Sequence, residues 1–229
     1  MDVVVMAAGE GRRLRPLTEV SPKPVLPIGG RPVIATLVRE LASAGFEEVT
    51  VVTGHLAEQI ERLLGDGAGF GLRIRYARQP EPLGSADAVR CALEAGARPP
   101  LLVLAADTVF ASGDLSGVAE LSESTTAALG VRPSADTGKT PVTVLNGLVT
   151  AIGEGEGEVR AAPLWILGEE IVAMLPELSG PPFELADAVR EAISSGKEVL
   201  AVELGPTRDL TRPEDVITHN FPYLSKGGK

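Results

Sequence analysis

VVVMAAGEGRRLRPLTEVSPKP, residues 3–24, joins an apolar run to a loop rich in glycine, arginine and proline. The run Val3–Ala7 is continuously apolar, which is typical of a strand buried on both faces. A glycine-rich turn directly after such a strand lets backbone amides approach an anion, because no side chain stands in the way. The prolines that follow stiffen the segment carrying Lys23, so less entropy is lost when this lysine meets a ligand.

Strands and helices alternate through the first half of the chain. Continuous apolar strands in that alternation predict an α/β fold whose parallel sheet is covered by helices on both faces. Ligands bind such sheets beyond the carboxyl ends of the strands, where both the glycine loop and Asp107 fall. The patterns predict strands over 3–7, 48–53, 72–77 and 101–106, and helices over 32–44, 56–64 and 85–95.

The second half has shorter apolar runs and a different order of elements. Asn146-Gly147 separates two of these runs and is a strong hairpin signal. The patterns predict strands over 126–131, 141–145, 148–152, 163–167 and 199–204, and helices over 184–194 and 213–218. With the first half, they predict a Rossmann-like, mixed, mostly parallel sheet flanked by helices, in a single domain.

Composition and charge narrow the class of ligand. The 229 residues are 44% hydrophobic and 23% charged, with a formal net charge of −10, which argues against nucleic acid as a partner. Residues 1–31 nevertheless hold five Lys or Arg and three acidic residues, a local excess that favours a small anion. One cysteine and two distant histidines exclude a disulfide framework and disfavour a zinc site. No apolar run reaches a membrane span and no signal peptide is visible, so we expect a cytoplasmic protein.

Two familiar glycine motifs do not fit the loop. A Walker loop requires Gly-Lys-Ser/Thr, whereas Gly11 is followed by two arginines. The dinucleotide-binding pattern requires a third glycine, where Leu14 stands, and an acid about twenty residues further on, where 30–34 has none. A nicotinamide-dependent dehydrogenase is therefore disfavoured.

The run from Met6 to Ile34 resembles the signature of the sugar nucleotidyltransferases, A-[AG]-G-x-G-x-R followed by P-L-T and P-K-P-[LV]. Further stretches resemble this family in the same order. QPEPLGSADAV at 79–89 resembles its base-recognition segment, and LLVLAADTVF at 101–110 resembles its strand that ends in a metal-binding aspartate. FELADAVREAISSGKEVLAVEL at 183–204 and RDLTRPEDV at 208–216 resemble its later segments.

The resemblance implies roles for particular residues. Asp107 and Asp209 would hold Mg²⁺, although either aspartate could instead cap a neighbouring turn or helix. Gln79 would read the base and Gly84 would give the base room, whereas we expect Asp87 to be solvated. Catalytic roles fall on Arg13 and Lys23, and nucleotide contacts on Ala7, Ala8, Gly9, Gly11, Arg13, Gln79, Gly84 and Ser85.

The acceptor side departs from the family pattern. Glu154 matches the glutamate of the family's E-K-P segment, but Gly155 stands at its lysine and Glu156 at its proline. We expect Glu154 and Trp165 on the acceptor side, with packing as the alternative role of Trp165. Two alternatives follow: the acceptor is an unusual one, or its phosphate is held by other groups, with Lys139 or Arg160 as candidates.

The resemblance implies an enzyme that joins a nucleoside triphosphate to a sugar 1-phosphate and releases pyrophosphate. The alternatives are a catalytically weak or inactive regulatory module of the same fold, and a cytidylyltransferase acting on a polyol phosphate such as inositol phosphate. We expect a nucleotide-binding half at 1–110, an acceptor half at 111–224 and a flexible tail at 225–229. Neither a nucleic acid nor a membrane is expected as a partner, and the chain is expected to be a monomer or a homo-oligomer.

Overall fold

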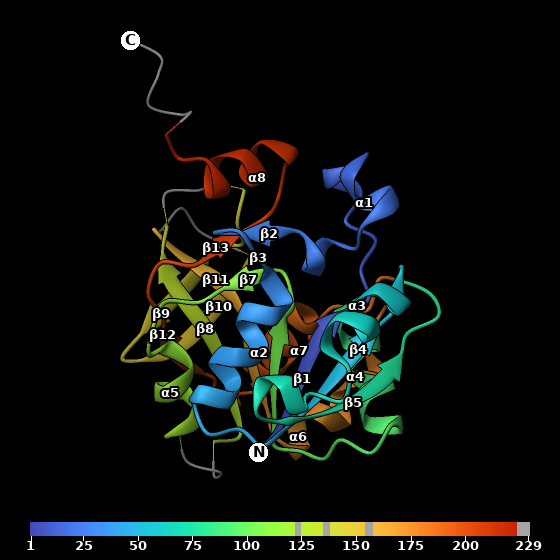
Figure 1. Cartoon of the computed structure of the whole chain (residues 1–229). Coiled ribbons are helices and arrows are strands. Elements are labelled where there is room, and N and C mark those ends of the chain that lie inside the picture. Colours follow the sequence, from blue (N-terminus) through green and yellow to red (C-terminus); the bar gives the residue numbers. More distant parts are fainter. Residues whose placement is uncertain (122–124, 135–137, 154–157, 224–229) are drawn as a thin grey trace.

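The computed structural model describes residues 1–121, 125–134, 138–153 and 158–223. Over these residues one nine-stranded sheet runs through the molecule in the order β5-β4-β1-β6-β11-β8-β12-β10-β9 (Figure 1). The strands are β1 (Asp2–Ala7), β4 (Glu48–Thr53), β5 (Arg73–Arg78), β6 (Leu101–Ala105), β8 (Ala127–Pro133), β9 (Val142–Leu145), β10 (Leu148–Ile152), β11 (Val159–Leu167) and β12 (Leu200–Glu203).

The sheet is parallel in the first half of the chain and mixed in the second. β1 lies between β4 and β6 and pairs with both in parallel, while β5 pairs in parallel with β4. β11 then runs antiparallel to both β6 and β8, so it joins the two halves. The predicted fold class, a mixed sheet flanked by helices, is confirmed.

Helices cover both faces of the sheet because consecutive side chains of the buried strands point to opposite sides. Val3 and Val5 of β1 pack in one core with apolar residues of α2, α3 and α5, whereas Val4 packs in a second core with α4, α6 and α7. The helices are α1 (Leu17–Val20), α2 (Val33–Ser43), α3 (Ala57–Leu64), α4 (Ser85–Glu94), α5 (Asp114–Ala119), α6 (Glu169–Met174), α7 (Leu185–Ser194) and α8 (Pro213–Asn220). None of the helices in the described ranges is long and apolar enough to cross a bilayer.

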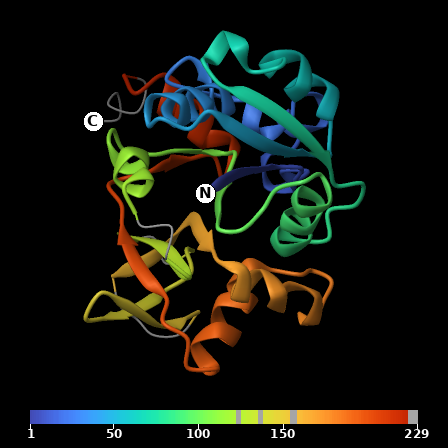
Figure 2. The same ribbon diagram turned by 90° about the horizontal axis from the view of Figure 1, so that it is seen from below.

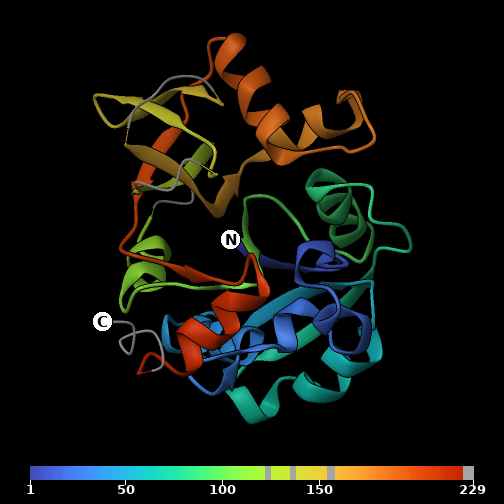
Figure 3. The ribbon, with the colours of Figure 1, turned by 90° about the horizontal axis from the view of Figure 1, so that it is seen from above.

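The C-terminal segment returns to the N-terminal half of the molecule. Figures 2 and 3 show the blue-to-green and yellow-to-orange segments gathered on opposite sides, with the red segment running from the second side back to the first. There β13 (Arg208–Asp209) pairs with β7 (Thr108–Val109). Asn220 at the end of α8 binds the hairpin of β2 (Pro27–Ile28) and β3 (Arg31–Pro32), donating to the Pro27 carbonyl at 2.8 Å.

A third, smaller core holds this return in place. It joins the loop after β1 to the segments that carry both candidate metal-binding aspartates. Its buried residues are Leu14, Leu26, Ile28, Val33, Val109 and Leu210.

The predicted hairpin is confirmed in its turn geometry. Asn146 and Gly147 join β9 to β10 with φ of 51° and 78°, both in the left-handed region that a type I′ turn requires. The expected tail at 225–229 lies outside the described residues, and the division at 110 stays a prediction.

Candidate active site

The loop after β1 is held by a left-handed glycine. Gly11 has φ of 63° and begins a short 3-10 turn over Arg12–Leu14. Its carbonyl accepts a hydrogen bond from the buried Thr18 hydroxyl at 2.9 Å, and a Cβ at Gly11 would lie 2.8 Å from Thr18 Cγ2. A Cβ at Gly9 would meet nothing within 4 Å. The two glycines therefore differ: Gly11 shapes the loop, and Gly9 leaves space above it.

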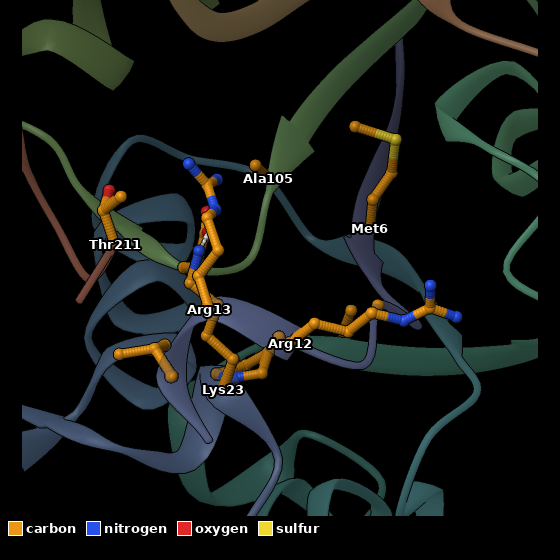
Figure 4. Close-up of a pocket in the computed structure, with 12 residues that line it drawn as sticks. Met6, Arg12, Arg13, Lys23, Ala105 and Thr211 are labelled. Carbon is orange, nitrogen blue, oxygen red and sulfur yellow. Dashed lines mark ion pairs between the residues drawn. The ribbon is translucent and has the colours of Figure 1, made fainter. Parts of the chain in front are cut away.

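The arginines of the loop point in different directions. Arg12 donates to Glu10 at 2.8 Å, and this hydrogen bond is the largest cause that lowers the pKa of the Glu10 carboxyl. Figure 4 shows the Arg12 side chain extending under Met6, whereas that of Arg13 extends toward Ala105 and Thr211. Among the described residues no carboxylate pairs with Arg13, so its charge is available to a ligand.

Lys23 lies opposite the end of β6. It begins the 3-10 turn Lys23–Val25, directly after Pro22 in an extended conformation. Its ammonium forms an ion pair with the Asp107 carboxylate, and both side chains are only partly exposed. The stiff segment expected from the prolines thus brings Lys23 against one of the two candidate metal-binding residues.

Short β pairing brings the two aspartates to one place. Asp209 and Thr108 are register partners in the antiparallel pair of β13 and β7, and Asp107 directly precedes Thr108. Direct antiparallel partners have Cα atoms about 5 Å apart, so residues far apart in sequence become neighbours. The predicted proximity of Asp107 and Asp209 follows from this pairing.

Asp209 lies beside one buried and one partly exposed cation. Its carboxylate pairs with Lys139, and Arg132 Nη2 lies 3.6 Å from Asp209 Oδ2. Arg132 is 6% exposed, and its Nε has no hydrogen-bond partner among the residues described. Asp209 does not cap the final helix, because the amides of Thr211 and Arg212 are bound by Asp215 Oδ2. The capping alternative for Asp209 is wrong.

Two cavities meet at this place. The first, of about 320 Å³, is lined by the glycine loop together with Arg13, Lys23 and Asp107. The second, of about 660 Å³, shares those three residues and continues past Lys139, Trp165 and Asp209. Of the predicted nucleotide contacts, Ala7, Gly9, Gly11 and Arg13 line the first cavity, whereas Ala8, Gln79, Gly84 and Ser85 line neither.

The segment around Gln79 has a tight structure of its own. Gly84 has φ of 114°, and a Cβ there would lie 2.2 Å from the Phe183 carbonyl oxygen. The close approach of Phe183 is thus a structural reason for this glycine, and its expected role beside the base stays a prediction. The Ser85 hydroxyl binds Glu184 and accepts from the Leu185 amide at 2.9 Å. These contacts fix the start of α4 against the start of α7.

Two residues were assigned wrongly or missed in the sequence. Asp87 is not solvated: its side chain is 14% exposed, and it binds both Gln79 and Arg90. Arg132 was missed, although a lone charged residue within the apolar run of β8 was the available signal.

Trp165 packs against the core and also lines the second cavity, so both of its expected roles have a structural basis. Glu154 and its neighbours Gly155 and Glu156 lie outside the described residues.

The fold and this site define an α/β protein with a cationic glycine loop that faces two carboxylates at the carboxyl edge of its sheet. The nucleotidyl transferase family model matches residues 2–140, more than half of the chain, and the chain belongs to this family.

Several known proteins resemble the chain. It is 27% identical over 237 aligned residues to the low-salt glycan biosynthesis nucleotidyltransferase Agl11 of Haloferax volcanii, covering 96% of this chain and 65% of that protein. It is 44% identical over 84 residues to N-acetylmuramate alpha-1-phosphate uridylyltransferase of Neisseria meningitidis, covering 37% of this chain and 36% of that protein. The chain thus spans less than two thirds of the length of both relatives.

The solved structures agree on the fold. A crystal structure of UDP-glucose pyrophosphorylase complexed with UDP-glucose superposes with a TM-score of 0.81 at 21% identity, over 98% of both chains.

Proposed function

We propose that the chain transfers a nucleotidyl group from a nucleoside triphosphate to a sugar 1-phosphate. A phosphate oxygen of the acceptor attacks the α-phosphorus, the bond from that phosphorus to the β-phosphate bridging oxygen breaks, and pyrophosphate leaves. The observation that carries this proposal is the junction of two cavities at Arg13, Lys23 and Asp107. A transfer between two anions requires two binding spaces with cations where they meet.

The first cavity suits the triphosphate. No atom lies within 4 Å of the Cβ position of Gly9, which lines this cavity, and Arg13 has no carboxylate partner among the described residues. The backbone at Gly9 and the Arg13 guanidinium can therefore bind the leaving pyrophosphate. Lys23 lies at the junction, where the transferred phosphoryl group would pass. Such reactions are accelerated by positioning and by charge stabilisation, without a covalent intermediate on the protein.

The two aspartates fit Mg²⁺ by the chemistry of their donors. Carboxylate oxygens are hard ligands of the kind this cation prefers, and β7 and β13 bring Asp107 and Asp209 together. When bound, the ion would neutralise negative charge on the reacting phosphates. Lys23 and Lys139, which pair with these carboxylates in the structure, would then be available to the substrates.

The second cavity suits the acceptor. Its volume of about 660 Å³ extends from Lys23 to Trp165, and Lys139 provides a cation in its wall. Arg160, the other candidate for the missing family lysine, does not line this cavity. We therefore assign the acceptor phosphate to Lys139. Magnesium dependence, cytoplasmic location and oligomeric state stay predictions from the sequence.

The test measures pyrophosphate release over the five common nucleoside triphosphates and a panel of sugar and polyol phosphates with Mg²⁺. We expect turnover with at least one sugar 1-phosphate, and a fall of a hundredfold or more in kcat for Asp107→Asn and Lys23→Met, because each removes a charge at the reacting phosphates. Asp66→Asn and Lys197→Met are matched controls away from the cavities and should keep full activity.

One further variant in that assay distinguishes binding of the acceptor from binding of the triphosphate. Lys139→Met should raise KM for the acceptor at least tenfold and leave KM for the triphosphate nearly unchanged. Nucleotide binding without turnover for any acceptor would support the regulatory module instead. Turnover with polyol phosphates alone would support the cytidylyltransferase alternative.

A further inference from the structure

Both ends of the glycine loop, residues 9–17, are bound by one residue outside the loop. The backbone amide of His55 donates to the Ala8 carbonyl at 3.1 Å, where the loop begins. The ring Nε2 of His55 lies 2.7 Å from the Thr18 carbonyl oxygen, where the loop ends. A carbonyl oxygen can only accept a hydrogen bond, so Nε2 carries a hydrogen and donates it. His55 thus fixes the two ends of the loop relative to each other.

The segment that carries His55 packs tightly against the start of the loop. Gly54 directly precedes it, and a Cβ at Gly54 would lie 2.8 Å from the Ala8 carbonyl oxygen. Leu56 directly follows it with φ of 50°, in the left-handed region that a leucine rarely adopts. Strained residues of this kind persist only where their surroundings hold them, and they cluster at functional sites. Strain at Leu56 thus accompanies the turn that brings His55 to both ends of the loop.

Thr18 connects His55 to Gly11, the left-handed residue of the loop. Thr18 is 1% exposed, and its hydroxyl donates to the Gly11 carbonyl at 2.9 Å. The Leu14 amide donates to the same carbonyl oxygen, also at 2.9 Å. A carbonyl oxygen has two lone pairs, and both are then used within the protein. The Gly11 carbonyl is therefore fixed toward α1 and cannot turn its oxygen toward a phosphate.

Fixing this carbonyl also fixes the amide on the other side of the same peptide bond. The C=O and N–H of a trans peptide point in opposite directions, so the Arg12 amide is turned away from Thr18. Over the described residues, neither the Arg12 amide nor the Arg13 amide donates to an acceptor of the protein. Gly11, Arg12 and Arg13 all line the first cavity. Successive free amides in such a turn are suited to bind an anion.

We propose that His55 and Thr18 are positioning residues for the triphosphate. His55 holds α1 by the Thr18 carbonyl, and the Thr18 hydroxyl in turn fixes the Gly11 carbonyl. The loop amides and Arg13 are thereby kept in the arrangement that binds the phosphates. Neither His55 nor Thr18 lines either cavity, so both act through the loop rather than by contact with a substrate. The inference rests on the proposed function for the assignment of the first cavity to the triphosphate, and it deepens that function by naming residues that set the affinity for the donor.

Gln59 provides a matched comparison in the neighbouring turn of α3. Its Nε2 donates to the Val20 carbonyl at 2.9 Å, so the end of α1 is also bound to α3 (Figure 1). This contact lies beyond Thr18 and is not part of the path from His55 to Gly11. Removing the Gln59 amide therefore removes a hydrogen bond of the same kind to α1 without interrupting that path.

The test measures triphosphate affinity in two pairs of variants of the full chain. His55→Leu and Thr18→Val remove the donors, whereas His55→Gln and Thr18→Ser keep a donor of similar reach. Calorimetric titration with the common nucleoside triphosphates and Mg²⁺, without an acceptor, gives the dissociation constants. For the nucleotide that the wild type binds most tightly, we expect about tenfold weaker binding in His55→Leu and Thr18→Val, the effect of one lost hydrogen bond. The other two variants should bind it nearly as the wild type does.

Two further readouts distinguish positioning from a general loss of stability. KM for the triphosphate should rise with the dissociation constant in His55→Leu and Thr18→Val, while KM for the acceptor stays nearly unchanged. Gln59→Leu should leave both KM values near those of the wild type. Amide hydrogen exchange of residues 9–17 in the free chain should be faster in His55→Leu than in Gln59→Leu, because only the first variant releases an end of the loop.

The outcomes separate this inference from the proposed function. Wild-type triphosphate affinity in His55→Leu and Thr18→Val overturns the inference and leaves nucleotidyl transfer intact. Equal weakening in Gln59→Leu also overturns it, since any loosening of α1 would then suffice. If His55→Leu does not fold, Thr18→Val decides by itself. Weakened binding in these variants, with no turnover of any acceptor by the wild type, overturns the proposed function alone. Absence of triphosphate binding by the wild type overturns both.

Discussion

Gly9 and Gly11 stand two residues apart in one loop, and the structure gives them different reasons to be glycine. Gly11 adopts a left-handed conformation against Thr18, where a side chain is strained and also meets a neighbour. Gly9 has no positive φ and no atom near the position of a Cβ. Glycine at position 9 therefore keeps a space open next to the backbone, and we propose that a phosphate occupies this space.

Alanine at each position separates stability from binding. Gly11→Ala should lower the free energy of unfolding by about 1–3 kcal/mol, from the strained φ and the contact with Thr18. Gly9→Ala should leave the unfolding free energy within about 0.5 kcal/mol of wild type and weaken triphosphate binding at least tenfold. Chemical denaturation and calorimetric titration measure the two effects. Wild-type nucleotide affinity in Gly9→Ala would remove Gly9 from the phosphate site.

Single residues were predictable where a motif fixed their surroundings. Lys23, Asp107 and Asp209 meet as expected because strand ends and proline-stiffened loops leave little choice of position. The burial of Asp87 was not predictable. Its partner Gln79 follows β5, and a contact between two elements does not appear in the local sequence pattern of α4.

At the scale of elements, α2 carries a partly buried acid, Glu40, whose Oε2 atom is shielded from solvent. Burial raises the pKa of Glu40 to about 7, opposed by Arg208 and assisted by Asp114. Among the described residues its Oε2 has no hydrogen-bond partner. The charged groups that act on it thus come from α5 and from β13, the strand that also carries Asp209.

This acid predicts a pH dependence of stability. Because its pKa is raised in the folded state, the Glu40 carboxyl favours folding most when it is protonated. Its contribution to the free energy of unfolding is complete below about pH 4.5 and is lost as pH rises toward 7. Glu40→Gln removes this loss. The variant should melt at nearly the wild-type temperature at pH 5 and above it at pH 8, by calorimetry. Glu94→Gln, an exposed control on α4, should show no such divergence, and a constant Glu40→Gln difference across pH would contradict the assignment.

Long elements were predictable and short ones were not. β4 and β10 have the bounds that their apolar patterns predict, and α4 and α7 differ by a single residue at one end. β7 and β13 have two residues each, too few for any periodicity, and they form only because the chain returns over the N-terminal half. The pairing that assembles the site was thus invisible to local patterns, although the resemblance to a family indicated its result.

At the scale of the whole molecule, the third core connects the loop of Arg13 and Lys23 to the C-terminal segment. Leu14 and Leu26 from the loop after β1 pack with Val109 of β7 and with Leu210 of the returning C-terminal segment. Asn220 adds hydrogen bonds to Pro27 and Gly30. The loop of Arg13 and Lys23 and the segment of Asp209 therefore pack on the same small hydrophobic core.

Hydrogen exchange should report this connection. Triphosphate binding should slow amide exchange in residues 9–25, and also in 208–220, because opening of either segment exposes the same core. β9 and β10 lie at the far end of the sheet and serve as an internal control with unchanged exchange. Protection limited to 9–25 would show that the two segments open independently.

The pairing of Thr108 with Asp209 has a consequence for biosynthesis. The strands of the large sheet are complete once residue 203 has been translated, whereas the second candidate metal-binding carboxylate follows six residues later. Domains emerging from the ribosome begin to fold before synthesis ends. A nascent chain at that stage carries the glycine loop, Lys23 and Asp107 without their partner strand. The sheet can therefore close ahead of its site, because the second carboxylate leaves the ribosome after the last strand of the sheet.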